Sequence, residues 1–205
     1  MDAPRGLVTF LFTDIVGSTR LWEQFPAAMP GAFRLHEQVV RQNALLNHGF
    51  VYKMIGDGFQ IAFATPRQAL AAAISIQRAL ATVNWAAIEP ISVRMGIHST
   101  QTEERGNDYV GPGLNRLARM LAAGAGGQIL VSERSAGLLH DDPLPGSALR
   151  DLGVHRLKDL SQPEHIFQAM AAALPARFPP LKTWHALPAR QYRRKGLPLL
   201  AAGMS

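Results

Sequence analysis

The chain of 205 residues has no cysteine, which excludes disulfide bridges and thiolate metal sites. It also has no apolar run near the roughly 20 residues that a membrane-spanning helix needs. The N-terminal stretch MDAPRGLVTFLF lacks a basic region before its apolar segment and a small-residue cleavage site after it, which argues against a signal peptide. We therefore expect no membrane segment and a cytoplasmic location.

Positive charge is in excess, with 21 Lys and Arg against 15 Asp and Glu and a net charge of +6. Such a surplus favours a polyanionic partner such as a nucleoside triphosphate. After residue 174 the sequence is rich in proline and loses its hydrophobic periodicity. We predict one folded domain at 1–174 and a flexible, proline-rich basic tail at 175–205. No aromatic residues are interleaved with the tail cations in a nucleic-acid-binding pattern, so no nucleic-acid partner is expected. These cations are Lys182, Arg190, Arg193, Arg194 and Lys195.

The first half of the chain reads as β-α-β-β-α-β. A β-branched and aromatic run at 7–13 predicts a buried strand, and a helical pattern follows, with Ser18 or Thr19 as N-cap and prolines that break or delay it. Residues 50–63 predict a hairpin, since Gly-Asp-Gly is a tight-turn sequence. Pro66 opens the next helix, and 91–97 is the last strand of this unit. The order is that of an α+β fold with a ferredoxin-like βαββαβ core, an antiparallel sheet with helices on one face.

The second half adds further C-terminal elements to this core. A polar loop is expected after His98, and two glycines at 126–127 predict a turn. The other predicted elements are helices at 113–122 and 135–139 and strands at 128–131, 154–157 and 165–170.

Two carboxylates carry the first indication of chemistry. Asp14 ends the first strand and Asp57 lies at the hairpin tip, so they become neighbours if these strands share a sheet. Paired carboxylates at strand ends often hold Mg²⁺ or Mn²⁺, and two such ions stabilise both oxygens of a phosphoryl displacement. The backbone N–H groups of Gly17, Ser18 and Thr19, at a helix start, suit phosphate. An equally open alternative is that Asp14 caps a helix and Asp57 only forms a turn.

Five motifs in order favour the metal hypothesis: FTDIVGST, KMIGDGF, VRMGIH, NDYVGPGLNRLARM and HRLKDL. Together they resemble the catalytic domain of class III adenylyl and guanylyl cyclases over roughly residues 6–170. The resemblance implies that Asp14, Asp57 and the Ile15 carbonyl bind two divalent metal ions, Mg²⁺ or Mn²⁺.

The same resemblance assigns the substrate-binding residues. It implies that Lys53 and Asp108 recognise adenine, since Lys53 can donate to N1 and Asp108 can accept from the N6 amino group. Asn115 would orient the ribose and Arg119 would stabilise charge on the α-phosphate, and these two residues share one helix face at i and i+4. Lys158 resembles a lysine that reaches the triphosphate. The histidines His98 and His155 are expected to be structural, because such metal sites prefer oxygen ligands.

The implied activity is adenylate cyclase, converting ATP to 3′,5′-cyclic AMP and pyrophosphate at sites shared across a homodimer. The segment at 99–101 departs from the family pattern, so a degenerate, nucleotide-binding regulatory domain with little turnover is the alternative. A polymerase-palm or diguanylate-cyclase relative would share the two-metal layout. The hairpin lacks their GG[DE]EF-type sequence and the chain has N-x-x-x-R, which argues against that reading.

Overall fold

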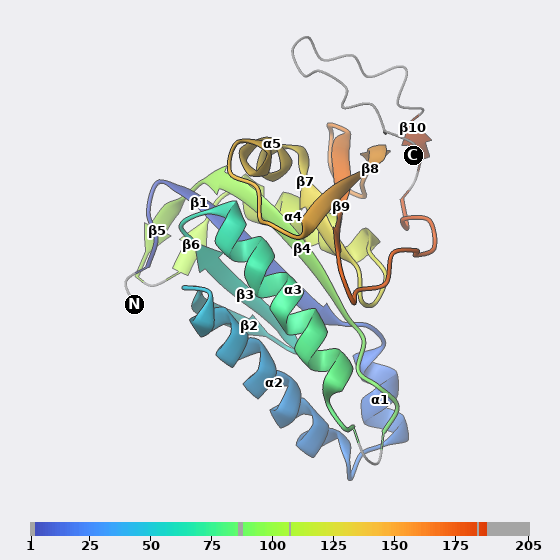
Figure 1. Cartoon of the computed structure of the whole chain (residues 1–205). Coiled ribbons are helices and arrows are strands. Elements are labelled where there is room, and N and C mark those ends of the chain that lie inside the picture. Colours follow the sequence, from blue (N-terminus) through green and yellow to red (C-terminus); the bar gives the residue numbers. More distant parts are fainter. Residues whose placement is uncertain (1–2, 86–87, 107, 184, 188–205) are drawn as a thin grey trace.

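The computed structural model describes residues 3–85, 88–106, 108–183 and 185–187. Its centre is an eight-stranded mixed sheet in the order β10-β8-β9-β7-β4-β1-β3-β2 (Figure 1). A small second sheet pairs β5 with β6. In this part of the chain, no helix is both long and apolar enough to cross a membrane.

The ferredoxin-like core predicted from the sequence is confirmed. Its four strands lie in the order β4-β1-β3-β2, and each neighbouring pair is antiparallel. The elements are β1 (Leu7–Ile15), α1 (Ser18–Gln24), α2 (Met29–Leu46), β2 (Phe50–Ile55), β3 (Gly58–Phe63), α3 (Pro66–Thr82) and β4 (Val93–Gln101).

The second half extends this sheet beyond β4. β7 joins β4 in parallel, and β9 and β8 continue the sheet in antiparallel fashion. The elements are β5 (Glu103–Arg105), β6 (Asp108–Val110), α4 (Pro112–Ala123), β7 (Ile129–Ser132), α5 (Glu133–Asp141), β8 (Ser147–Arg156), β9 (Glu164–Ala171) and β10 (His185–Leu187).

Three local expectations are corrected. The N-cap of α1 is Gly17, with φ 73°, and neither Ser18 nor Thr19 caps the helix, because the chain turns sharply out of β1 in a left-handed conformation. The polar segment after His98 is not a loop: its first residues end β4, paired along β1 as far as Gln101, and Glu103–Arg105 form β5 of the small sheet. β8 begins at Ser147, seven residues before the predicted start, because its exposed residues hide the apolar signal that marks a strand.

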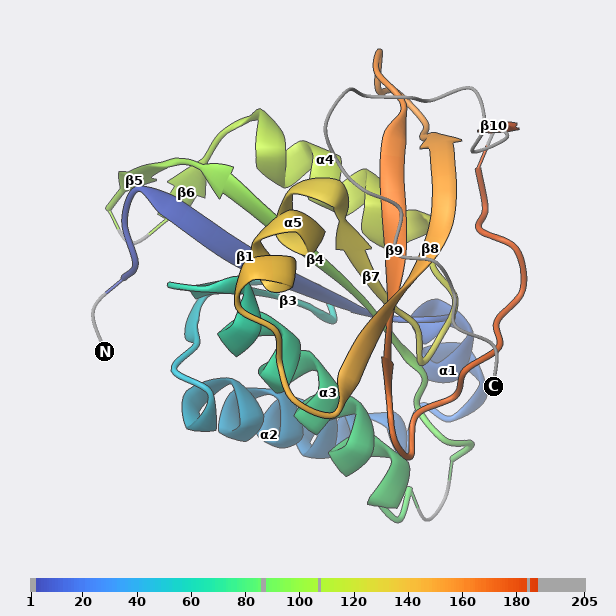
Figure 2. The same cartoon turned by 45° about the horizontal axis from the view of Figure 1, so that its top comes forward.

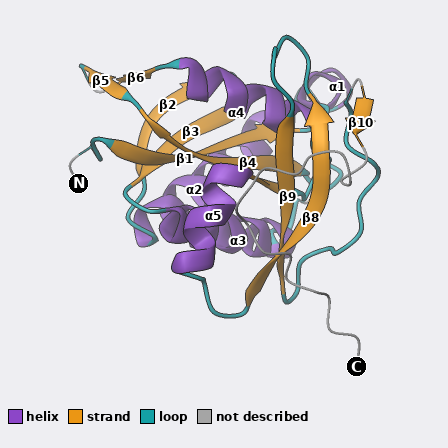
Figure 3. Cartoon of the chain, turned by 90° about the horizontal axis from the view of Figure 1, so that it is seen from above, coloured by secondary structure: helices purple, strands orange, loops and turns teal. Residues whose placement is uncertain are grey.

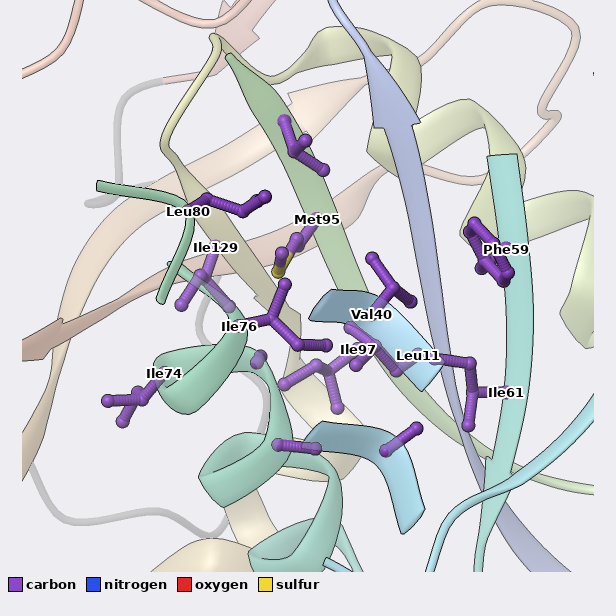
Figure 4. Close-up of a cluster of buried hydrophobic side chains, with 14 of the residues drawn as sticks. Leu11, Val40, Phe59, Ile61, Ile74, Ile76, Leu80, Met95, Ile97 and Ile129 are labelled. Atoms are coloured by element: carbon purple, nitrogen blue, oxygen red, sulfur yellow. The ribbon is translucent and has the colours of Figure 1, made fainter. Parts of the chain in front are cut away.

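The sheet has two differently covered faces. α2, α3 and α5 pack on one face around a large apolar core, in which Leu11, Ile61, Ile76 and Ile97 converge (Figures 3 and 4). α4 lies alone on the opposite face, where its apolar side packs on the other set of strand residues (Figure 2). The expectation of helices on one face therefore holds for α2 and α3 of the ferredoxin-like unit, while α4 lies on the other.

Part of the predicted tail lies against the domain. The Arg150 guanidinium donates to the Ala176 carbonyl at 2.7 Å, and the Lys182 N–H donates to the Ala123 carbonyl at 3.0 Å, at the end of α4. β10 extends the sheet along β8. The tail cations after Lys182 fall in 188–205, outside the described residues. The domain boundary at 174 and the flexible tail thus stay predictions.

Candidate active site

The two carboxylates predicted to bind metal lie close together at one end of β1 and β3. A side chain at Gly58 would place its Cβ 2.8 Å from the Thr13 carbonyl and 3.9 Å from Asp14 Oδ1, so only glycine lets the hairpin tip approach this closely. Burial raises the pKa of Asp14, the bonds from Arg94 oppose this, and the negative charge of Asp57 raises it further. The charge of Asp57 therefore reaches Asp14.

Arg94 is a site residue that the sequence analysis missed. It lies directly opposite Asp14 in the β1–β4 register, and its Nε donates to Asp14 Oδ2 at 2.8 Å. Its Nη1 also donates to the Ala122 carbonyl at 2.9 Å, which fixes the guanidinium between β1 and the end of α4. The signal was present in the motif VRMGIH, but only strand pairing brings its arginine beside the carboxylate.

The residues at this end of the sheet fit a divalent cation. The Asp57 carboxylate has one buried oxygen, Oδ2, without a hydrogen-bond partner, and a carboxylate left unsatisfied in this way is a favourable cation ligand. Asp14 contributes a second carboxylate, and Ile15, 2% exposed, follows it in the same strand. Among the described residues no group of three or more His, Cys, Asp or Glu side chains gathers around a common point, so a metal here would rely on two carboxylates and a carbonyl.

The predicted phosphate-binding segment, Gly17 to Thr19, lies just after the end of β1. Gly17 precedes α1, which begins at Ser18 and includes Thr19, and the first intrahelical bond runs from the Leu21 N–H to the Gly17 carbonyl. The start of α1 thus lies within a few residues of Asp14. Binding of phosphate by these N–H groups stays a prediction.

Lys53 and Asp108, predicted to recognise adenine, form an ion pair across 55 residues of sequence. A bulge in β2 makes this possible. Before the bulge, Val51 pairs with Ile61, and both face α2. After the bulge, Lys53 pairs with Gln60. Gln60 lies on the same side of β3 as Ala62, which packs toward α4. The extra residue thus turns Lys53 to the α4 face of the sheet. The hydrogen bond from Lys53 lowers the pKa of Asp108, so this carboxylate is ionised at neutral pH.

An aromatic cluster supports this ion pair. The rings of Phe10, Tyr52 and Tyr109 meet edge to face, with centroids 4.9 to 5.8 Å apart. Tyr109 is 3% exposed and donates its hydroxyl to the Pro4 carbonyl at 2.8 Å. Since Tyr52 and Tyr109 directly adjoin Lys53 and Asp108 in sequence, this packing fixes the two short strands that present the pair.

The remaining predicted residues lie on or near α4. Asn115 and Arg119 are exposed, and Arg119 pairs with Asp159 at 2.8 Å. Asp159 follows Lys158, which is exposed in the loop between β8 and β9, so this loop reaches the α4 face. α4 itself packs tightly on β4, because a Cβ at Gly113 would lie 2.6 Å from Thr100 Oγ1. Asp14, Lys53 and the α4 residues therefore lie on the side of the sheet that carries α4, whereas Asp57 lies at the hairpin tip.

Comparison with known proteins identifies the family of the chain. Residues 2–158 match the family model of the adenylate and guanylate cyclase catalytic domain. An uncharacterized protein of Mycobacterium tuberculosis is 36% identical over 184 residues, which cover 88% of this chain but only 61% of that protein. An adenylate cyclase of Podospora anserina is 30% identical over 86% of this chain and 11% of its own length.

A solved structure shares the fold at full domain length. An adenylate cyclase of Trypanosoma brucei, in its monomeric state, superimposes with a TM-score of 0.78 at 26% identity, over 87% of this chain and 95% of that one. The chain belongs to the class III adenylate and guanylate cyclase catalytic domain family. The family model covers both activities, so membership leaves the choice of nucleotide base to the site itself.

Proposed function

We propose that this chain is an adenylate cyclase, which converts ATP to 3′,5′-cyclic AMP and pyrophosphate. The ion pair of Lys53 with Asp108 is the observation that carries the choice of base. A carboxylate accepts from the adenine N6 amino group and an ammonium donates to N1, whereas guanine presents an acceptor and a donor at these positions. A base that left both groups unpaired would bind much more weakly.

The carboxylate pair supports the chemistry of the same proposal. Asp14, Asp57 and the Ile15 carbonyl would hold divalent metal ions, which supply positive charge to the attacking ribose 3′-oxygen and to the triphosphate. The N–H groups of Gly17, Ser18 and Thr19 would receive phosphate oxygens. In the reaction the 3′-oxygen bonds to the α-phosphorus as the bond to the pyrophosphate oxygen breaks.

The α4 residues supply the remaining roles. Asn115 would orient the ribose, and Arg119 would stabilise the charge that develops on the α-phosphate, with Lys158 on the outer phosphates. These cations need little rearrangement to do so, since Arg119 is held only by an exposed ion pair with Asp159.

We further propose a homodimer in which each site takes Asp14 and Asp57 from one copy and Lys53, Asp108, Asn115 and Arg119 from the other. The resemblance to class III cyclases motivates this arrangement. Exposed apolar side chains next to the adenine pair support a partner surface there: Met54 and Ile55 follow Lys53, and Val110 follows Asp108, with exposed fractions of 41%, 58% and 39%.

A regulatory domain with little turnover is the second candidate. It is favoured by the way the site cations already have partners within one chain, Lys53 with Asp108, Arg94 with Asp14 and Arg119 with Asp159. Such a charge-satisfied site would also suit a domain that binds nucleotide and does not turn it over.

The test is cyclic nucleotide formation from ATP or GTP by the purified chain with Mn²⁺. We expect cyclic AMP from the wild type, none from Asp57→Ala or from Arg119→Ala, and partial recovery in a mixture of the two variants, because one mixed site regains both halves. Arg67→Ala is the matched control, since Arg67 has the same 46% exposure as Arg119 and a similar ion pair at 2.8 Å. No product from a folded, dimeric wild type would favour the regulatory domain instead.

A further inference from the structure

One region of the core contains buried polar atoms that have no hydrogen-bond partner. His36, in α2, is 0% exposed, and neither of its ring nitrogens has a hydrogen-bond partner. Asp57 Oδ2 is also buried and unpartnered. A buried polar atom without a partner costs about 1–3 kcal/mol, so two unsatisfied groups in one region call for a physical reason.

The imidazole contacts the start of β3, which directly follows the hairpin turn that carries Asp57. Its ring contacts Phe59, two residues after Asp57, with centroids 5.7 Å apart and planes at 63°. Phe59 is itself fixed, since its N–H donates to Thr13 Oγ1 at 3.1 Å and the Arg41 guanidinium lies 5.3 Å from its ring centroid. α2 therefore holds His36 against Phe59, at the start of the strand that follows Asp57.

The two unsatisfied groups are chemically complementary. Burial lowers the pKa of His36 to about 4, and the negative charge of Asp57 acts in the opposite direction. In either charge state the ring carries at least one N–H donor, while Asp57 Oδ2 is an acceptor. The negative charge of Asp57 acts on the His36 ring. Neither the donor nor the acceptor has a competing hydrogen-bond partner.

We propose that His36 is a positioning residue for Asp57, which it holds from its ring N–H through one buried water. One carboxylate oxygen is then fixed from below and the other is presented to a metal ion. This inference rests on the proposed role of Asp57 as a metal ligand. Hydrogen bonds to ligating carboxylates from residues behind them orient the ligand and tune its affinity for the metal.

The test is Mn²⁺ binding to the nucleotide-free chain, measured from the electron paramagnetic resonance signal of the free ion. His36→Leu keeps the volume and removes the donor, and we expect its Kd for Mn²⁺ to rise about 10-fold or more. His36→Gln keeps an N–H donor of similar reach, and we expect its Kd to stay within about threefold of the wild type. The shorter His36→Asn should resemble His36→Leu, and this pair tests the proposal if the leucine variant does not fold.

His98→Leu is the matched control, because His98 is equally a buried imidazole but donates to or accepts from Ser132 Oγ at 2.8 Å. We expect it to lower stability and leave Mn²⁺ affinity unchanged. Equal Mn²⁺ affinities for the wild type, His36→Leu and His36→Asn, or equal losses in His36→Leu and His98→Leu, would overturn the role of His36. Asp57→Ala separates the two levels, since an unchanged Kd in that variant would instead contradict the metal site itself.

Discussion

The two faces of the sheet differ in how they are covered, and this difference divides stability from function. Three helices close one face over an apolar core that includes Leu11, Ile61, Ile76 and Ile97, each 0% exposed. The other face carries α4 as its helix, and Asp14, Lys53 and Asp108 lie along it, while Asp57 lies at the hairpin tip. A face that one helix leaves partly open can receive a nucleotide and a second copy, while the closed face keeps the strands rigid.

Two side-chain truncations, one on each face, test this division most directly. Ile76→Ala removes a fully buried side chain of the closed face, and we expect a loss of about 2–5 kcal/mol in the free energy of unfolding with kcat retained in the folded fraction. Asn115→Ala removes an exposed α4 side chain, and we expect about 100-fold to 1000-fold lower kcat with stability within about 0.5 kcal/mol.

Urea unfolding and cyclic AMP assays on both variants measure these effects. If Ile76→Ala lowered kcat as much as Asn115→Ala does, the apolar core of the closed face, and not His36 alone, would contribute to catalysis and the division would be wrong.

A pH series tests the part of the α4 face that is buried. Burial, aided by the charges of Arg116 and Arg134, lowers the pKa of His98 to about 4 from 6.5. As pH falls, His98 therefore takes up a proton in the unfolded chain before it does so in the folded one. The contribution of His98 to the free energy of unfolding is full above about pH 6.5 and is lost toward about pH 4, by up to about 3 kcal/mol.

Urea unfolding between about pH 7 and pH 4.5 should show this loss, and His98→Leu should flatten the slope because it removes the titrating group. Parallel slopes for wild type and variant would show that other groups cause the acid sensitivity.

Base selectivity tests the open face. Lys53→Met removes the donor to adenine N1 and keeps the length of the side chain, so we expect kcat/KM for ATP relative to GTP to fall about 10-fold to 100-fold. Arg67→Met is a suitable control, since Arg67 lies on α3 and has an exposed ion pair with Asp142. An unchanged ratio in Lys53→Met would remove the basis for the proposed preference for ATP.

Two glycine substitutions test the close packing of α4, and we expect them to have the smallest effects. A Cβ at Gly113 would lie 2.6 Å from Thr100 Oγ1, so Gly113→Ala should push α4 away from β4 and cost about 1–3 kcal/mol. A Cβ at Gly137, in α5, would meet nothing within 4 Å, so Gly137→Ala should stabilise the domain by about 0.5–1 kcal/mol through helix propensity. Thermal unfolding measures both, and the same sign for the two variants would contradict the close packing of α4.

Much of the fold was predictable because its signals are local. Proline at 66, the Gly-Asp-Gly turn and the apolar runs fixed the βαββαβ order, and the structure confirms it. The start of β8 at Ser147 was not predictable, since that strand lies near the sheet edge and much of it is exposed. The end of β4 was likewise missed, because Ser99 is polar yet buried, with its hydroxyl bonded to those of Thr9 and Ser135.

The sequence by itself determined the residue types of the site and their order, because motif spacing and the turn glycines are properties of the chain. Only the tertiary structure decided which of these residues meet. The β2 bulge turns Lys53 toward Asp108, strand pairing sets Arg94 beside Asp14, and α2 packs His36 against Phe59, two residues after Asp57. These are contacts between residues far apart in sequence, and they depend on register and packing, which no local pattern encodes.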